Sequence, residues 1–390
     1  MRLALVLAAP FPTLQGSQRH VAEQARALQG AGAEVTLFTY GTGTDTTRAG
    51  RSVADLEVIR VPAGLSPRSL RSGFQPAKLV ADFALGIRLL REHRRRNFDA
   101  ILAHNVEAAA TALSVRRWLR RPVVYMAHTL WEEELASYLP QAAAGTARAL
   151  GARIDRGLAS WADAVVVLSR EAEARLAPFA HGDITRIVPG YTPEPPPDPK
   201  QIENACNRFG LEAEGFVLYP GNLDRYQNLA LLDAAAEHFD LGPVLAGAHD
   251  TRGVAFPNLR ALSIDDPETL RQLVFAARIV VIPRRAVGGF PIKALQAMEA
   301  ARPIVALEGV VDTLTHDESA WLLPQGADGR DLAAALHGLW NDAEHRARLG
   351  KNARATLAHP SNRGDVLSAV SVVSQRNNGN SGKNVPTPDR

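Results

Sequence analysis

The chain is 390 residues long, with 46% hydrophobic and 22% charged residues and a formal net charge of +3. These values are typical of a soluble globular protein, and a chain of this length is expected to form two domains. The single cysteine, Cys206, excludes an internal disulfide, and no apolar run reaches the ~18 residues that a membrane-spanning helix needs. We therefore expect a cytoplasmic protein in a reducing compartment.

The first half of the chain alternates apolar runs, which predict buried parallel strands, with helical segments. We predict strands at 3–8, 35–38, 58–61, 99–105 and 122–126, and helices at 19–32 and within 68–96. Two further strands, within 162–169 and 187–190, are implied by a resemblance described below. Two strands end in polar residues, one in His104 and Asn105 and the other in His128. Polar groups at the carboxyl ends of parallel strands line the ligand crevice of such folds.

Basic residues are concentrated in this half. Residues 1–195 hold 24 Lys and Arg against 18 Asp and Glu, a balance of +6, whereas the remainder has 20 against 23. Eight basic side chains lie in 68–96 and four arginines in 116–121. Such clusters suit an anionic membrane surface or an anionic acceptor, and solvated helix faces explain them equally well. We expect the clusters to share one face and to favour the inner surface of a membrane, with no nucleic-acid partner.

The segment 192–200 contains five prolines and is predicted to be a linker, because it cannot continue a helix or a sheet. It separates a first domain at 1–191 from a second at 201–360. The second domain is predicted to contain a strand that enters a loop within 216–223 and strands at 244–247, 261–264, 279–282 and 304–307. Helices are predicted at 229–236 and 270–277, and 329–358 is a long amphipathic helical region. A last helix at 361–375 precedes a polar tail at 376–390, which we expect to be disordered.

The stretch 278–307 joins two of these strands through a glycine loop and a helix. Gly288 and Gly289 lie in the loop, and Pro291 begins a segment with helical periodicity. This βαβ unit presents backbone N–H groups at a helix N-terminus, which is an arrangement suited to a phosphate or pyrophosphate. A tight corner without a ligand is the alternative interpretation.

The same stretch resembles the signature of the nucleotide-sugar-dependent glycosyltransferases of family four, which have the GT-B fold. The family pattern Glu-Gly-Phe-Gly-x-x-x-x-Glu-Ala-Met-Ala, with its flanking prolines, is matched at Pro283, Gly289, Phe290, Leu295, Ala297, Met298, Pro303 and Val305. The first glutamate of the pattern falls on Gly288 and the second on Gln296. In the family these glutamates help to hold the donor. Gln296 retains neutral hydrogen bonds for a ribose but brings no charge.

The resemblance continues at GNLDRYQN, residues 221–228. The family has an Arg and a Lys here that clamp the donor pyrophosphate, and their positions fall on Asn222 and Gln227. The chain is similar to a branch that carries Gly-Asn-x-x-x-Tyr-Gln together with Gly-x-Pro-Ile-Lys. Substitute cations are available, namely Arg225, Arg284, Arg285 and Lys293. We predict that backbone N–H groups at 288–290 hold the donor phosphates, assisted by Lys293 and by one of Arg284 and Arg285.

In the first domain, residues 162–169 resemble a family strand, Ala-Asp-x-Val-x-x-x-Ser, and residues 187–190 resemble the strand and turn that lead out of that domain. The loop at Gly16 resembles the family loop that faces the donor diphosphate. A family histidine in the place of His128 lies near the reacting anomeric carbon, so we favour His128 over His104 for the chemistry. A hydrogen-bonded residue at a strand end is the alternative role of His128. His104, Asn105 and Glu132 are candidate acceptor-side residues, and the glutamate-rich segment 131–140 is either a mobile acceptor loop or the start of a solvated helix.

The resemblance implies two Rossmann-like doubly wound domains facing across a cleft, with the segment at 361–375 crossing back to the first domain. His128 and Gly16 would lie on one wall, and Gly289 and Lys293 on the other. It also implies transfer of a hexose from a nucleotide sugar to a glycan or lipid-linked acceptor with retention of configuration, in bacterial-type surface-glycan synthesis. No metal and no cofactor are expected, and the sequence contains no Asp-x-Asp, no clustered Cys/His ligands and no Gly-x-Gly-x-x-Gly after the first strand.

Two alternatives remain at this point. The changed donor residues also fit a catalytically impaired relative that binds a glycan or a protein partner. A nucleotide-sugar epimerase with the same fold is the second alternative, although its motif spacing differs.

Overall fold

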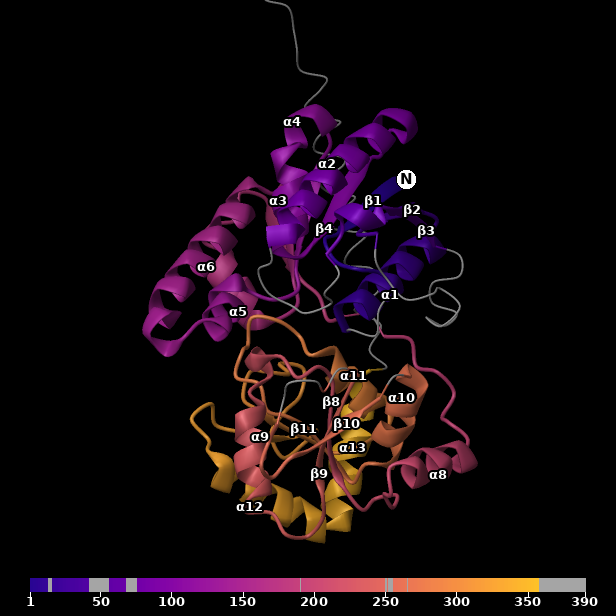
Figure 1. Cartoon of the computed structure of the whole chain (residues 1–390), viewed down its shortest axis with the longest axis vertical. Helices are drawn as coiled ribbons and strands as arrows, with labels where there is room; N and C mark the ends of the chain where they lie inside the picture. Colours follow the sequence, from indigo (N-terminus) through magenta and orange to yellow (C-terminus); the bar gives the residue numbers. More distant parts are fainter. Residues whose placement is uncertain are drawn as a thin grey trace, which may run out of the picture.

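The computed structural model describes residues 1–12, 16–41, 56–67, 76–189, 191–249, 251, 255–264 and 266–357. The chain forms two lobes, each built on a parallel sheet flanked by helices (Figure 1). This architecture confirms the predicted α/β class with two parallel-sheet domains. The predicted helix at 361–375 and the tail at 376–390 lie outside the described residues.

The first sheet has seven strands in the order β3-β2-β1-β4-β5-β6-β7, and every pair is parallel. The strands are β1 Arg2–Leu7, β2 Glu34–Thr39, β3 Glu57–Arg60, β4 Ala100–His104, β5 Val123–Ala127, β6 Ala164–Val167 and β7 Asp183–Arg186. The strand predicted at 187–190 is wrong, because the last strand lies at 183–186. This edge strand is half-exposed and polar, so it has no apolar run to mark it.

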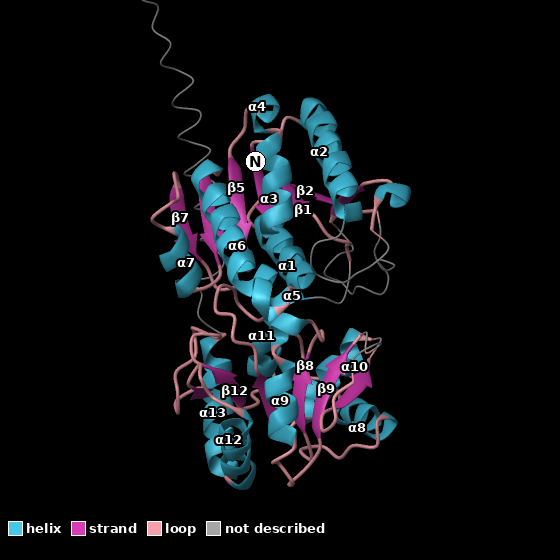
Figure 2. Ribbon diagram, turned by 60° about the vertical axis from the view of Figure 1, so that its left-hand side comes forward, coloured by secondary structure: helices cyan, strands magenta, loops and turns pink. Residues whose placement is uncertain are grey.

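Helices flank this sheet on both faces (Figure 2). They are α1 Gly16–Gly30, the short 3₁₀ helix η2 Ala63–Leu65, α2 Pro76–Arg96, α3 Asn105–Ser114, α4 Arg116–Leu119, α5 Trp131–Tyr138, α6 Gln141–Trp161 and α7 Arg170–Leu176. The glutamate-rich segment is therefore a helix, α5, which packs against α6 as a hairpin turned at Pro140. It is not a mobile loop.

The second sheet has six parallel strands in the order β10-β9-β8-β11-β12-β13. They are β8 Val217–Pro220, β9 Val244–Ala248, β10 Arg260–Ser263, β11 Ile279–Ile282, β12 Ile304–Leu307 and β13 Trp321–Leu323. The accompanying helices are α8 Pro199–Arg208, η3 Arg225–Gln227, α9 Leu229–Ala236, α10 Pro267–Ala276, α11 Ile292–Glu299, α12 Gly329–Asn341 and α13 Ala343–Thr356. The helical region predicted at 329–358 contains two helices, since Asp342 ends one and caps the next through the N–H of His345.

The segment between the domains is shorter than predicted, because Pro199 and Lys200 already belong to α8. Asp198 caps this helix by accepting the N–H of Lys200, and Pro199 fits the first turn, where its missing N–H costs nothing. Upstream, the buried carboxylate of Glu299 accepts the hydroxyl of Tyr191 at 2.6 Å. The segment is thus tied to the second domain by its own hydrogen bonds.

In both sheets the strand order reverses beside the first strand of the sheet, between β1 and β4 and between β8 and β11. Open α/β sheets bind their ligands in the crevice outside the carboxyl ends of the strands at such a point. The two crevices face each other, because α1 contacts α11 and α5 contacts η3 across the boundary of the lobes (Figures 1 and 2).

Candidate functional site

Three histidines lie together where the first domain faces the second. His104 ends β4 and His128 directly follows β5, and Nδ1 of His104 lies 2.9 Å from Nε2 of His128. The ring of His20, on α1, meets that of His128 edge-on with centroids 5.0 Å apart. The two candidates His104 and His128 therefore act as one hydrogen-bonded unit, and His128 is the more exposed of the two.

Burial keeps this cluster uncharged at neutral pH. It lowers the pKa of His20 to about 4 and that of His104 to about 3, and it holds the pKa of His128 well below the ordinary value. Neighbouring imidazoles lower the pKa values of His104 and His128 further, because a second positive charge would be repelled. Neutral imidazoles can donate or accept hydrogen bonds without attracting a phosphate by charge.

On the opposite side, one polar network joins the two motifs that distinguish this chain. Nζ of Lys293 donates to Oε1 of Gln227 at 2.7 Å and to the Tyr219 hydroxyl at 2.6 Å. Gln227 in turn donates to Oδ1 of Asn222 at 2.9 Å. Residues 222, 227 and 293 are thus brought together, and a lysine from α11 stands beside the loop that lacks the family Arg and Lys.

Gly221 explains why the lysine can lie there. Its φ of +152° is rarely adopted by other residues, and an added Cβ would lie 2.9 Å from both Cε and Nζ of Lys293. Desolvation, followed by repulsion from Arg284, holds the pKa of Lys293 well below its ordinary value. A bound diphosphate would oppose this shift, because an adjacent anion favours the charged form of the lysine.

The glycine loop between β11 and α11 packs directly on the first domain. A Cβ on Gly289 would lie 2.1 Å from the carbonyl oxygen of His128, so only glycine allows this approach. The buried guanidinium of Arg284 donates to the Gly289 carbonyl, and burial lowers its pKa. The backbone N–H of Gly288, which we predicted to face a phosphate, donates instead to Oε2 of Glu133 at 2.8 Å.

Helix α5 brings acidic groups into this interface. Asp155 of α6 fixes its start by accepting the N–H groups of Trp131 and Glu132 at 3.1 and 2.9 Å. Burial raises the pKa of Asp155 to about 6 and also raises the pKa of Glu134. The carboxylate of Glu134 accepts the hydroxyl of Thr129 at 2.9 Å.

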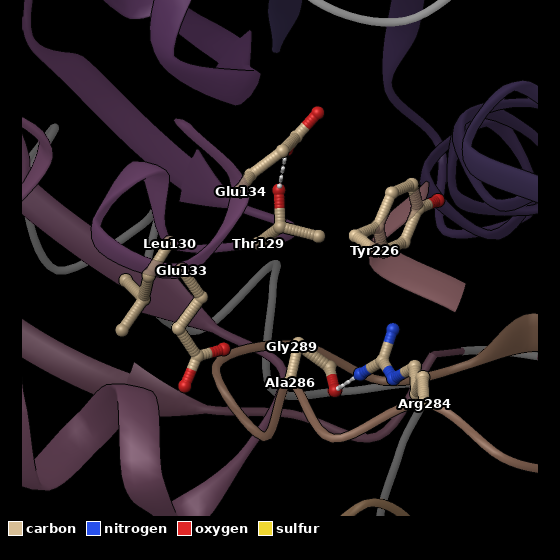
Figure 3. A pocket seen from close by; sticks show the side chains of 8 residues that line it. All are labelled: Thr129, Leu130, Glu133, Glu134, Tyr226, Arg284, Ala286 and Gly289. Atoms are coloured by element: carbon tan, nitrogen blue, oxygen red, sulfur yellow. Dashed lines mark hydrogen bonds between the residues drawn. The ribbon is translucent and has the colours of Figure 1, made fainter. Parts of the chain in front are cut away.

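A pocket of about 240 Å³, partly open to solvent, separates α5 from the C-terminal loops (Figure 3). Its lining residues are Thr129, Leu130, Glu133, Glu134, Tyr226, Arg284, Ala286 and Gly289. Part of this volume is open solvent, so the enclosed space is far below the roughly 300–1,000 Å³ of typical ligand sites. This pocket is therefore too small for a nucleotide sugar in the present arrangement, and binding there would require the lobes to separate.

The other predicted residues are less central. Arg225 is exposed on η3, and the exposed Arg285 donates to the carbonyl of Ala327 at 2.8 Å, away from the glycine loop. Phe290 is buried in the core of the second domain, and Gln296 is half-buried on α11. Three predicted residues of the first domain remain. Gly16 begins α1, Asn105 begins α3 with a φ of 70°, and Glu132 lies 3.6 Å from Arg175.

Sequence reasoning missed four residues of this interface: His20, Glu133, Glu134 and Tyr226. The adjacent acids in WEEEL were one signal, because acidic residues favour the first turn of a helix. Among the described residues, no group of three or more His, Cys, Asp and Glu side chains is placed to hold a metal ion. In the same part of the chain, no helix is both long and apolar enough to cross a membrane.

The sequence matches two family descriptions. Residues 14–195 match Glycosyltransferase Family 4, and residues 258–356 match Glycosyl transferases group 1. Two relatives are named D-inositol 3-phosphate glycosyltransferase. The protein of Stackebrandtia nassauensis is 30% identical over 405 residues, covering 93% of this chain and 87% of the relative. That of Xylanimonas cellulosilytica is 27% identical over 368 residues, covering 87% of each.

Solved structures agree on the fold. HepE of Anabaena in complex with UDP-glucose has a TM-score of 0.71 at 17% identity, covering 98% of this chain and 99% of that one. Sucrose-phosphate synthase of Thermosynechococcus elongatus has a TM-score of 0.72 at 18% identity, covering 98% of both chains. The chain therefore belongs to the group 1 glycosyltransferases of family 4, and its two domains have the GT-B fold.

Proposed function

We propose that this glycosyltransferase moves a hexose from a nucleotide-sugar donor to a glycan or lipid-linked acceptor, with retention of configuration and without a metal or cofactor. The observation that carries the proposal is the placement of the Lys293 network and the histidine cluster on the two facing crevices. One side offers a cation and backbone amides for a departing diphosphate. The other offers neutral imidazoles for an uncharged sugar.

Charge determines which residues contact the diphosphate and which contact the sugar. Transfer requires that the diphosphate be stabilised as its bond to the anomeric carbon breaks, and preorganised cations and N–H groups do this most effectively in a site that excludes water. We assign that task to Lys293 and to the other amides of the glycine loop, because Glu133 accepts the N–H of Gly288. We assign to His128 a contact with the sugar or the acceptor hydroxyl near the reacting carbon.

A related structure supports the choice of donor class, and the names of the relatives suggest a further acceptor to test. The structural neighbour from Anabaena was solved with UDP-glucose, and the relatives are named for D-inositol 3-phosphate as their substrate. At 17% and 27% identity neither ligand transfers directly to this chain. Both are suitable first probes, together with GDP-linked sugars and lipid-linked acceptors.

We also propose that the basic end of the first domain meets an anionic membrane at the cytoplasmic face, in the synthesis of a surface glycan. The described part of the basic segment, α2, lies beside α4, and Arg121 donates to Asn97 between them. Ion pairs reduce the free charge, since Arg96 pairs with Glu92 and Arg116 pairs with Asp163. Residues 68–75 lie outside the described part. The test is co-sedimentation of the protein with vesicles. If the amount of bound protein changed neither with the phosphatidylserine content of the vesicles nor with the salt concentration, the result would contradict this proposal.

The function is tested with the full chain, nucleotide sugars and acceptors. We expect release of nucleoside diphosphate that depends on an acceptor and persists with EDTA. If the sugar of the donor were isomerised in the absence of an acceptor, the protein would be an epimerase instead. Glycan binding without any nucleotide binding would identify a catalytically impaired relative.

A further inference from the structure

Gly288 cannot offer a side chain to the pocket, but a carboxylate from the other domain occupies the space beside it. Oε2 of Glu133 accepts the N–H of Gly288, and a Cβ on Gly288 would lie only 3.0 Å from this oxygen. We propose that Glu133 binds hydroxyl groups of the donor sugar, so that the first domain supplies the acidic contact of the donor site. This inference rests on the proposed function.

Two contacts within the first domain hold Glu133 in place. Asp155 caps the helix that carries it, and Oε1 lies 3.2 Å from Nη1 of Arg175. In the present arrangement of the lobes, the other oxygen also accepts the N–H of Gly288 at 2.8 Å. A side chain held in this way loses little further conformational freedom when a ligand binds, which favours affinity and specificity.

Hydrogen-bonding capacity distinguishes Glu133 from its neighbour. The two oxygens of Glu134 already accept the hydroxyls of Thr129 and Tyr138 at 2.9 and 3.0 Å. Each oxygen of Glu133 has one of the contacts described above, and a carboxylate offers about four acceptor sites. The remaining sites are available to sugar hydroxyls, and Figure 3 shows the side chain reaching from α5 to the glycine loop.

The charge of the pocket determines which part of the donor fits there. Glu133 and Glu134 both line it, against the single guanidinium of Arg284. A diphosphate would be repelled by the carboxylates, whereas the hydroxyls of a neutral hexose donate hydrogen bonds to them. The same argument predicts discrimination against a uronic acid, because its carboxylate would face that of Glu133. The assigned donor class is therefore a nucleotide linked to a neutral hexose.

The test compares sugar-bearing and sugar-free ligands by calorimetry. Glu133→Gln keeps the shape of the side chain and removes its charge, and we measure the Kd of UDP and UDP-glucose, with GDP and GDP-mannose in parallel. We expect the nucleotide sugar to bind about tenfold more weakly and the diphosphate to bind as in the wild type. Glu171→Gln is the matched control, because Glu171 also pairs with Arg175, at 2.7 Å, but is absent from the pocket lining. It should leave both values unchanged.

Other outcomes overturn the inference in distinguishable ways. Equal weakening of diphosphate and nucleotide sugar would mean that Glu133 only supports closure of the lobes. Tighter binding of the diphosphate would mean that Glu133 competes with phosphate for the Gly288 amide. Unchanged binding of both would exclude any contact. A wild type that binds none of the four ligands would overturn the proposed function itself.

A separate experiment tests the preference for a neutral hexose. UDP-glucuronate should bind the wild type more weakly than UDP-glucose, and Glu133→Gln should reduce this difference in affinity. An unchanged difference would contradict the neutral-hexose assignment.

Discussion

Nδ1 of His104 lies 2.9 Å from Nε2 of His128, which makes the ends of β4 and β5 one hydrogen-bonded unit. Since both rings are neutral, one nitrogen of this pair carries a hydrogen and donates the hydrogen bond, and the other nitrogen accepts it. His104, which is fully buried, therefore orients the slightly more exposed ring of His128.

We expect His128→Ala to lower kcat by about 10²–10³, as does removal of a preorganised hydrogen-bonding group in other enzymes. His104→Leu should lower kcat by only about tenfold, because it misorients His128 without removing it. Steady-state kinetics of both variants check this prediction. The affinity for nucleoside diphosphate is the control and should not change. If His104→Leu were the more damaging variant, the assignment of His128 as the contacting residue would be wrong.

A second prediction concerns acid stability. The pKa of His20 falls from 6.5 when unfolded to about 4 when folded, so the unfolded state binds the extra proton first. Protonation of the unfolded state therefore lowers the free energy of unfolding as the pH falls from 6.5 towards 4, by up to about 3 kcal/mol. His20→Leu should therefore lose less stability than the wild type between pH 7 and pH 4.5 in urea unfolding.

Asp82 and Asp155 act in the opposite direction. Burial raises the pKa of each to about 6, so both contribute stability as the pH falls below that value. The comparison between His20→Leu and the wild type largely cancels their contributions, which is why the difference is the quantity to measure. Parallel pH profiles for the two proteins would contradict the charge-neutral histidine cluster.

The third prediction links helix α5 to donor binding. Asp155→Ala removes the acceptor of two backbone N–H groups at the start of α5, and we expect a loss of about 1–2 kcal/mol in the free energy of unfolding. Because α5 carries Glu133, the KM for the nucleotide sugar should also rise. Asp198→Ala is the matched control, since Asp198 caps α8 and should cost stability without changing this KM.

The fourth prediction concerns the attachment of the linker. Arg271 and Glu299 form a buried ion pair at 3.1 Å, and Nη2 of Arg271 also donates to the carbonyl of Pro195 at 2.8 Å. Arg271→Met leaves the Glu299 carboxylate buried without its cation, so we expect a loss of about 3–5 kcal/mol in urea unfolding. The double variant Arg271→Met/Glu299→Leu should recover part of the loss. A double variant less stable than the single one would contradict the explanation.

Much of the fold could be predicted from the sequence, because buried parallel strands are short apolar runs. The strands at 279–282 and 304–307 and the helix at 229–236 lie where they were expected. The polar edge strand β7 had no such signal. The helical region predicted at 329–358 is confirmed, but its division into two helices depends on Asp342, which ends the first and caps the second.

The candidate site was predictable in its parts but not in its connections. Polar residues at strand ends identified His104, His128 and the glycine loop. The bond between Gln227 and Lys293 joins residues 66 positions apart, and that between Glu133 and Gly288 joins residues 155 positions apart. Such contacts depend on how two helices and two domains are placed, which local periodicity does not determine.

The central claim is that the donor diphosphate binds at Lys293 in the second domain, and it is tested most directly by calorimetric titration of Lys293→Met. UDP and GDP are titrated beside uridine and guanosine, which lack the phosphates. A charge-assisted contact contributes roughly 1.5–3 kcal/mol, so the diphosphates should bind the variant about ten- to hundredfold more weakly, while nucleoside affinity stays unchanged. Diphosphates that bind the variant as tightly as the wild type would contradict the account.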